Sequence, residues 1–180
     1  MKARILRGCI FSILIALLGF FLISCRETPA ERGIPNPEEI SEKEATNIGI
    51  IKEYTEAIHN VDYEKFKEII DPNAVWYYRG RKMPHTPENT RDIHAHWKSA
   101  LPDQNYGIEI IFAKDDKVAV LFDFTGTHQG TLLGYPPTGN KISVGEMVIY
   151  RLENKRIVEH WVVFDEHLLR QQLSEKDVEN

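Results

Sequence analysis

Hydrophobic side chains recur every three or four positions along three segments that precede Leu101. This spacing places them on one face of a helix and predicts three amphipathic helices. Thr86 and Pro87 add a start signal to the third helix, because threonine offers a capping oxygen and proline fits the first helical turn. The predicted helices cover residues 42–60, 62–70 and 86–100.

After Asp103 the pattern changes to runs rich in β-branched and aromatic residues, separated by short polar or glycine- and proline-rich segments. A similar run at 74–78 follows a predicted turn at Asp71-Pro72-Asn73. Helices followed by a strand meander predict an α+β domain, with about three N-terminal helices packed on a curved, mainly antiparallel sheet. The runs after Asp103 are 106–113, 117–128, 141–152 and 156–164.

The first 24 residues have the pattern of a secretory signal peptide. Three basic residues and no acidic residue precede an apolar run over 10–23. This run is shorter than the about 20 apolar residues that a helix needs to cross a membrane. A basic start and a short apolar stretch therefore favour a removable signal. An uncleaved signal-anchor helix is the alternative.

The segment Leu22-Ile23-Ser24-Cys25 at the end of this run resembles the bacterial lipobox. In such signals the chain is cut before the cysteine, whose thiol is joined to a diacylglycerol. The resemblance implies a signal peptide over 1–24, lipidation of Cys25 and a location in the bacterial cell envelope, outside the cytoplasm. Because several acyl chains anchor a protein stably, the lipid would hold the chain on the membrane.

The segment that follows Cys25 has the composition of a linker. Residues 26–41 contain three prolines and few apolar side chains, which predicts an extended tether. The sequence therefore predicts a lipidated cysteine and tether over 25–41, a folded domain over 42–176 and a tail over 177–180.

Composition excludes several classes of protein. The 180 residues allow one ordinary domain with an appendage, and 42% hydrophobic with 27% charged residues argue against disorder. A net charge of −5 argues against binding nucleic acid through its phosphates. Two cysteines cannot form a disulfide framework or a zinc cage, and no phosphate-binding loop or Ser-His-Asp order occurs. We expect no cofactor, no metal and no nucleic acid, and a small apolar molecule as substrate or ligand.

Asp165 is the first candidate for chemistry. Strand alternation places it on the same face as Trp161 and Val163, at the end of the last predicted strand. A carboxyl group at the rim of an apolar cavity would keep its proton near neutral pH and could transfer it. Asp165 also precedes an apparent helix over 166–173, where it would serve as an N-cap. The residues leave both roles open.

His128 is the second candidate. Alternation places it with Phe122 and Phe124, so it could be a polar group on an apolar face that orients a carbonyl or moves a proton. A histidine buried for structural reasons is the alternative. Gly126 and Gly130 beside it indicate bulges or close backbone contacts. The aromatic residues that we expect to contact a substrate are Trp76, Trp97, Phe124 and Trp161.

Several segments, taken in their order and spacing, resemble one family. They are Leu101–Asp103, Thr125–Gly130, Gly134 with Pro136–Gly139, Arg156–Trp161, Asp165 and Gln172–Leu173. Together they resemble the SnoaL-like polyketide cyclases, often called ester cyclases, over about residues 45–175. The chain departs from the family pattern at Asn154-Lys155-Arg156, where members usually read Asp-Gly-Lys, and at Ser174, where glycine is usual.

The resemblance implies a ketosteroid-isomerase-like, or nuclear transport factor two-like, α+β cone. It also implies a cofactor-free intramolecular aldol ring closure, in which an aspartate near the end of the last strand moves the proton. Asp165 matches that position in Trp-x-x-x-Asp, and His128 matches a motif residue without a transferable role. Such cones often pair through their sheets, which implies a homodimer. Two functions remain open: an acid–base enzyme, and a binding lipoprotein that holds an apolar ligand or a partner protein.

Overall fold

The computed structural model describes residues 40–174. The predicted signal peptide, the lipidated Cys25, most of the tether and the tail lie outside the described residues. The chain divides into two compact units, of which the second spans Ile40–Asn180. Both hydrophobic core clusters lie in this second unit, so we expect the segment 40–180 to fold on its own.

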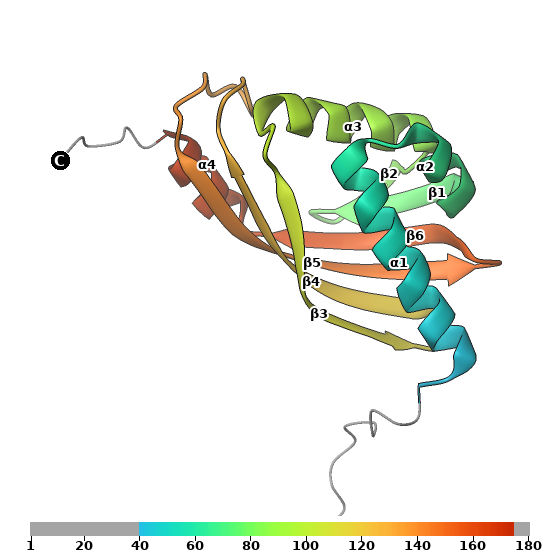
Figure 1. The fold of residues 1–180 in the computed structure, drawn as a ribbon. Helices are drawn as coiled ribbons and strands as arrows, with labels where there is room; N and C mark the ends of the chain where they lie inside the picture. The colour runs from blue at the N-terminus through green and yellow to red at the C-terminus, as the bar shows by residue number, and fades with distance from the viewer. Residues whose placement is uncertain (1–39, 175–180) are drawn as a thin grey trace, which may run out of the picture. The chain divides into compact units, whose positions relative to one another are not determined.

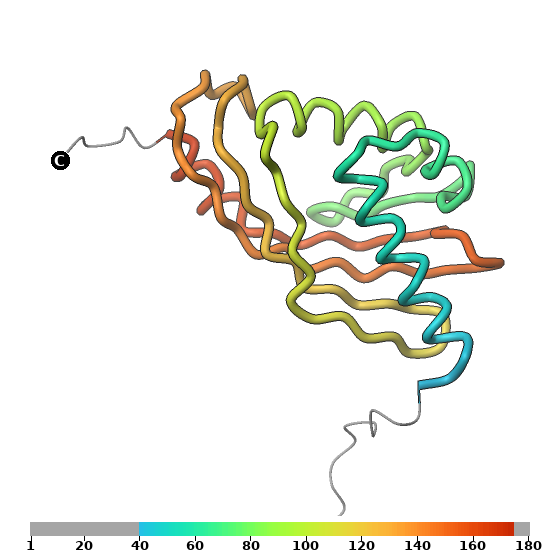
Figure 2. The backbone as a smooth tube through the Cα atoms, in the orientation of Figure 1, coloured from blue at the N-terminus to red at the C-terminus, as the bar shows by residue number. Residues whose placement is uncertain are grey.

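The predicted α+β class is confirmed. Three N-terminal helices lie over one face of a six-stranded curved sheet, and a fourth helix follows the last strand (Figure 1). The strands bend along their length, so the sheet curls around the space beneath the helices (Figure 2). The helices are α1 (Glu42–Asn60), α2 (Tyr63–Ile69), α3 (Pro87–Ala100) and α4 (Glu166–Ser174). The strands are β1 (Ile70–Tyr78), β2 (Arg81–Pro84), β3 (Asn105–Lys114), β4 (Lys117–Thr127), β5 (Lys141–Glu153) and β6 (Arg156–Phe164).

The strand order is β2-β1-β6-β5-β4-β3. All neighbouring strands are antiparallel except β1 and β6, which run parallel. Alternation sets the two faces of the sheet. On β4, Val118, Val120 and Phe122 are buried, and the residues between them are only partly buried. The buried side chains form the concave inner face, which the helices cover.

The N-terminal part of the sheet differs from the prediction. The predicted turn at 71–73 lies within β1, and β2 was not predicted. The register of β1 against β6 shifts between Ile70 and Val75, which accommodates Pro72 because proline has no N–H to donate to a ladder. Arg79 and Gly80, both with positive φ, then make the turn into β2.

A carboxylate fixes the start of α1. Ser41 and Glu44 form a capping box, and Glu44 also accepts a hydrogen bond (2.9 Å) from the backbone N–H of Asp115 in the β3–β4 turn. The Asp115 N–H, followed by the Ser41 donors, lowers the pKa of Glu44 to about 2. This contact joins the first turn of α1 to the far end of the sheet.

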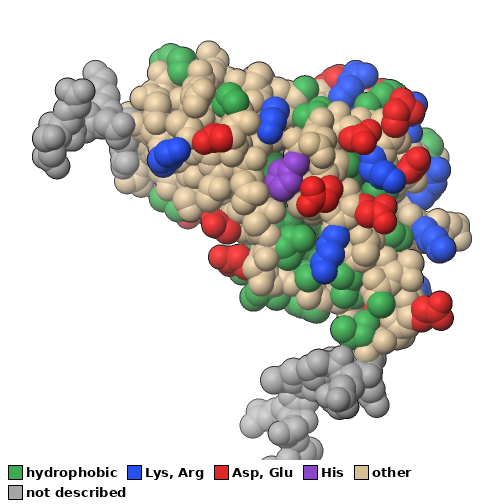
Figure 3. Space-filling view, in the orientation of Figure 1, with side chains coloured by type: hydrophobic (Ala, Val, Ile, Leu, Met, Phe, Trp, Pro, Cys, Tyr) green, Lys and Arg blue, Asp and Glu red, His purple; other side chains and the backbone are tan. Residues whose placement is uncertain are grey.

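Acidic and basic side chains are mixed over the helical side (Figure 3).

The predicted close backbone contact at Gly130 is confirmed. A methyl group on Gly130 would lie 2.6 Å from the carbonyl oxygen of Ser99 and 2.9 Å from Cα of Ala100. Because both atoms belong to the backbone, either the segment at Gly130 or the segment at Ser99 and Ala100 would have to move. We expect Gly130→Ala to lower the free energy of unfolding by about 1–3 kcal/mol in chemical denaturation. Gly145→Ala is the control, since a methyl group on Gly145 would meet nothing within 4 Å; equal effects of the two substitutions would contradict the assignment.

Candidate active site in the sheet cavity

A cavity of about 350 Å³ lies between the helices and the inner face of the sheet. Its walls come from α1, α3, the inner faces of five strands and the start of α4. Most of its lining is aromatic or aliphatic, which suits a small apolar ligand. The larger aromatic residues that line it include Trp76, Trp97, Tyr106, Phe122, Phe124 and Phe164.

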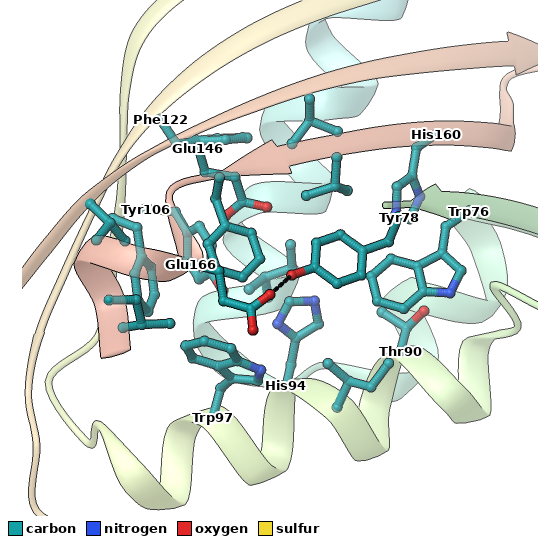
Figure 4. Close-up of a pocket in the computed structure, with 18 of the residues that line it drawn as sticks. Trp76, Tyr78, Thr90, His94, Trp97, Tyr106, Phe122, Glu146, His160 and Glu166 are labelled. Carbon is teal, nitrogen blue, oxygen red and sulfur yellow. Dashed lines mark hydrogen bonds between the residues drawn. The ribbon is translucent and has the colours of Figure 1, made fainter. Parts of the chain in front are cut away.

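Glu146 is a carboxyl group inside this cavity (Figure 4). It lies on β5 in register with Phe122 of β4 and Phe164 of β6, so aromatic residues flank it on both neighbouring strands. Among the described residues, none forms a hydrogen bond or an ion pair with it. Burial raises the pKa of Glu146 to about 7, because the apolar surroundings disfavour the ionised form. Near neutral pH this carboxyl group can therefore both accept and donate a proton.

The charge of Glu146 affects the pKa of three tyrosines in the cavity. Burial, and then the nearby charge of Glu146, raise the pKa of Tyr54 and of Tyr106 well above the ordinary value. The same two causes, together with the other tyrosines, raise the pKa of Tyr150. All three hydroxyl groups therefore stay protonated and can donate hydrogen bonds within the cavity.

Three histidines form a second polar group in the cavity wall. The rings of His85 and His160 meet edge to face with centroids 4.2 Å apart, and His85 Nδ1 lies 3.1 Å from the hydroxyl oxygen of Thr90. Burial lowers the pKa of His85 to about 3, that of His94 to about 4 and that of His160 well below its ordinary value. All three are therefore neutral at pH 7.

Two of these three imidazole rings have a nitrogen atom that no described residue hydrogen-bonds. The Nδ1 atoms of His94 and His160 are buried and have no hydrogen-bond partner among the described residues. Unpaired buried polar atoms are costly, so they indicate a place where a ligand or water completes the hydrogen bonding. Within residues 40–174, no cluster of three potential ligands is arranged to hold a metal ion.

Glu166, at the start of α4, also lines the cavity. The hydroxyl of Tyr78 donates a hydrogen bond to it over 2.6 Å, as Figure 4 shows. Arg79 and Arg170 form ion pairs with it at 3.0 and 2.8 Å. The Tyr78 hydrogen bond and then the Arg170 hydrogen bond lower the pKa of Glu166, so this carboxylate is ionised, unlike Glu146.

Three of the four aromatic residues that we expected to contact a substrate line the cavity, and the fourth does not. Trp76, Trp97 and Phe124 line the cavity, and Trp97 packs edge to face on Phe124 with ring centroids 5.5 Å apart. Trp161 does not line it. Its side chain lies on the outer face of the sheet and stacks on Tyr77 at 5.2 Å, because β6 turns alternate residues away from the helices.

Asp165 is the N-cap of a helix, which is one of the two roles that the sequence left open. Its Oδ1 accepts a hydrogen bond (2.9 Å) from the backbone N–H of Leu168, and its side chain is exposed and outside the cavity lining. It caps the first turn of α4, where a carboxylate satisfies a free N–H group. The expectation of a sequestered Asp165 is therefore wrong, and a part for Asp165 in proton transfer stays a prediction.

His128 also lies outside the cavity lining. It is fully buried, with its Nδ1 2.9 Å from the hydroxyl of Thr138, and its backbone bonds to Asn140 and Gly139 fix the loop before β5. Burial lowers the pKa of His128. These contacts fit the structural alternative for this histidine, and its contact with a substrate carbonyl stays a prediction.

Glu146 was not among the predicted site residues, although the sequence carries a signal for it. Alternation applied to 141–152 gives one face with Ile142, Val144, Val148 and Tyr150, and Glu146 is in phase with them. A lone carboxyl group on an otherwise apolar strand face is unusual enough to mark a functional site. The same alternation places His160 on the inner face of β6.

A curved sheet that encloses an apolar cavity under a layer of helices defines a class of α+β domains, and the comparisons identify the family within this class. The model of the SnoaL-like polyketide cyclase family matches residues 49–173. The chain belongs to this family. A search of curated proteins finds no match.

Solved structures agree with this family. IdmH from Streptomyces antibioticus, described as a candidate polyketide cyclase, is 27% identical, with a TM-score of 0.64 over 72% of this chain and 99% of its own. AclR from Streptomyces galilaeus, described as a candidate hydroxylase, is 26% identical, with a TM-score of 0.65 over 72% of this chain and 96% of its own. A SnoaL-like protein from Jannaschia sp. CCS1 has a TM-score of 0.69 at 18% identity, over 76% of this chain and 96% of its own, and shows the fold alone.

Proposed function

We propose that this domain catalyses cofactor-independent proton transfer on a small apolar carbonyl compound, as a cyclase or an isomerase, and that Glu146 moves the proton. The observation that carries the proposal is the carboxyl group of Glu146 inside an aromatic cavity, where burial raises its pKa to about 7. General bases and acids work best when their pKa lies near the working pH. Membership of the polyketide cyclase family supports the same class of reaction.

The proposed reaction begins with ionised Glu146. It takes a proton from the carbon next to the substrate carbonyl, and the electron pair of the broken C–H bond moves onto the carbonyl oxygen. The resulting enolate either attacks a second carbonyl carbon, which closes a ring, or regains the proton at another carbon. Glu146 returns the proton at the end, so no cofactor is consumed.

The charge that develops on the oxygen needs hydrogen-bond donors. The hydroxyl groups of Tyr54, Tyr106 and Tyr150 stay protonated in the cavity that holds Glu146, and neutral His94 or His160 can supply an N–H. Donors fixed in a water-poor cavity stabilise such charge more than donors in water do. The mixed set allows either a tyrosine or a histidine to bind the oxygen.

The test uses 5-nitrobenzisoxazole, a neutral aromatic compound that loses a carbon-bound proton to a base and opens to a coloured phenolate. We expect the segment 40–180 to accelerate this reaction above its rate with free carboxylate at equal concentration. The rate should rise with pH through an apparent pKa of about 7, because only ionised Glu146 accepts the proton. Binding of the probe without acceleration would instead support the alternative, a binding lipoprotein that holds an apolar ligand or a partner protein.

We further propose that lipid on Cys25 holds the domain at the membrane of the bacterial cell envelope, outside the cytoplasm. The lipobox-like segment before Cys25 supports this proposal. No helix among residues 40–174 is long and apolar enough to cross a membrane. We expect the full-length chain to partition into the detergent phase of Triton X-114 and Cys25→Ser to lose that partitioning. A variant that stays in the detergent phase would favour the signal-anchor alternative.

A homodimer that pairs through the outer sheet face is also proposed. Register places apolar residues side by side on five strands. One row holds Ile110, Leu121, Met147 and Val163, and the next holds Phe112, Ala119, Ile149, Trp161 and Tyr77. Val163 is 70% and Phe112 59% exposed in the single chain. Charged residues border this surface on the row that contains Lys117 and Arg151, and an apolar centre with a polar rim is typical of protein interfaces.

The dimer is tested by sedimentation. We expect the segment 40–180 to sediment as a dimer and Val163→Lys to sediment as a monomer, because a buried unpaired lysine opposes association. Glu56→Lys, on the helical side, is the control and should leave the dimer intact. A monomeric unsubstituted segment at tens of micromolar would contradict the proposal.

A further inference from the structure

Two exposed arginines line the cavity on elements that are far apart in the sequence, and we call this exposed part of its wall the mouth. Arg79 belongs to the β1–β2 turn and Arg170 to α4, and both line the cavity. Glu166 lies between them, with one carboxylate oxygen on Arg79 and the other on Arg170. Two cations and one anion therefore give the mouth an excess of positive charge, in a chain whose net charge is −5.

A second depression of about 400 Å³ adjoins the mouth. Six of its lining residues also line the cavity, among them Arg79, Glu166 and Arg170. Val163, which also belongs to the proposed dimer surface, and His167 complete it on the outer side. We call this depression the vestibule. The shared residues mean that a ligand longer than the cavity would pass the two arginines as it leaves the apolar interior.

Both arginines have hydrogen-bonding capacity left for a ligand. A guanidinium group has five N–H donors. Arg79 contacts Glu166 through one terminal nitrogen. Arg170 contacts Glu166 through Nε and one terminal nitrogen and also interacts with the hydroxyl of Tyr135, so Arg79 has the larger number of free donors. The side chain of Arg79 is 68% exposed and that of Arg170 42% exposed, so both can be reached from the vestibule. Planar guanidinium groups with free N–H pairs recognise carboxylate, sulfonate and phosphate groups in preference to neutral ones.

We propose that the site takes an amphiphilic organic anion: its apolar body fills the cavity, and its anionic group lies in the vestibule on Arg79 and Arg170. Glu166 holds the two arginines apart and lowers their attraction for the anion. This inference adds to the proposed function the charge of the ligand. It rests on the proposed function only for the reaction that follows binding. The substrate would then be a carbonyl compound that also carries an acidic group.

The experiment compares two fluorescent probes with the same aromatic body. 1-Anilinonaphthalene-8-sulfonate carries an anionic group, and N-phenyl-1-naphthylamine lacks it. We expect the segment 40–180 to bind the sulfonate more tightly at low salt, with a preference that falls as salt rises. The double substitution Arg79→Gln with Arg170→Gln should lower the affinity for the sulfonate by about tenfold or more. It should change the affinity for the neutral probe by no more than about twofold. Glu166→Gln should change sulfonate affinity in the opposite direction, because it removes the competing carboxylate.

Lys82→Gln is the matched control, since it removes one positive charge near the same turn, outside both depressions. It should leave the preference for the sulfonate unchanged. Equal affinity of the two probes for the unsubstituted segment, or a preference that survives loss of both arginines, would overturn the inference. Binding is measured without turnover, so loss of catalysis in the benzisoxazole assay and loss of anion preference are separate results.

Discussion

Replacing Glu146 by glutamine is expected to lower the rate of proton abstraction from 5-nitrobenzisoxazole by about a hundredfold to ten-thousandfold. Glutamine keeps the size and hydrogen-bonding shape of the side chain but cannot accept the proton. The neighbouring aromatic residues would still bind the probe, so the loss should appear in kcat and leave KM nearly unchanged. Steady-state rates at pH 8, where Glu146 is largely ionised, measure the effect best.

Asp165→Asn is the matched control for this loss. It makes the same chemical change in a carboxylate that caps α4, and asparagine caps helices about as well as aspartate. The control should keep both the rate and the stability of the unsubstituted segment. A rate that falls with Asp165→Asn and survives Glu146→Gln would return the catalytic role to Asp165 and contradict the site described above.

The second large effect is on stability. Burial raises the pKa of Glu146 from 4.5 to about 7. The folded state therefore holds this proton more tightly than the unfolded state, and the resulting stabilisation is present below pH 4.5 and is lost as the pH rises towards 7. Relative to Glu146→Gln, the unsubstituted segment should lose about 2–3 kcal/mol of unfolding free energy between pH 5 and pH 8.

Urea denaturation of both proteins at several pH values measures this difference. Other titrating groups, such as Glu44 at the start of α1, are common to both proteins and cancel in the comparison. We expect Glu146→Gln to be the more stable protein at pH 8. A difference that does not change with pH would mean that Glu146 is solvated in the folded state.

Much of the fold follows from local patterns in the sequence. The start and end of α1 coincide with the prediction because the apolar spacing and the Ser41 cap agree with each other. The hairpin of β1 and β2 was not predicted, because β2 is only four residues long (Arg-Lys-Met-Pro) and carries no alternation, and because Pro72 is typical of a turn. The parallel pairing of β1 with β6 joins residues more than eighty positions apart, which no local pattern encodes.

The site was less predictable than the fold. Trp76, Trp97 and Phe124 are large aromatic residues in regular elements, and the structure brings all three to the cavity. Asp165 could not be placed from alternation, because the chain leaves β6 at Phe164 and turns into α4, so strand parity no longer applies. Glu146 could have been found from alternation on β5, but its proximity to three tyrosines depends on how α1, β3 and β5 pack.

The central claim is that Glu146 titrates near neutral pH inside the cavity, and a ¹³C NMR titration of the glutamate carboxyl carbons tests it most directly. The resonance that disappears in Glu146→Gln identifies the group. We predict that this resonance titrates with a pKa of about 7, well above the other glutamates. A midpoint near 4.5 for Glu146 would contradict the account, since such a carboxylate is no better a base than one in water.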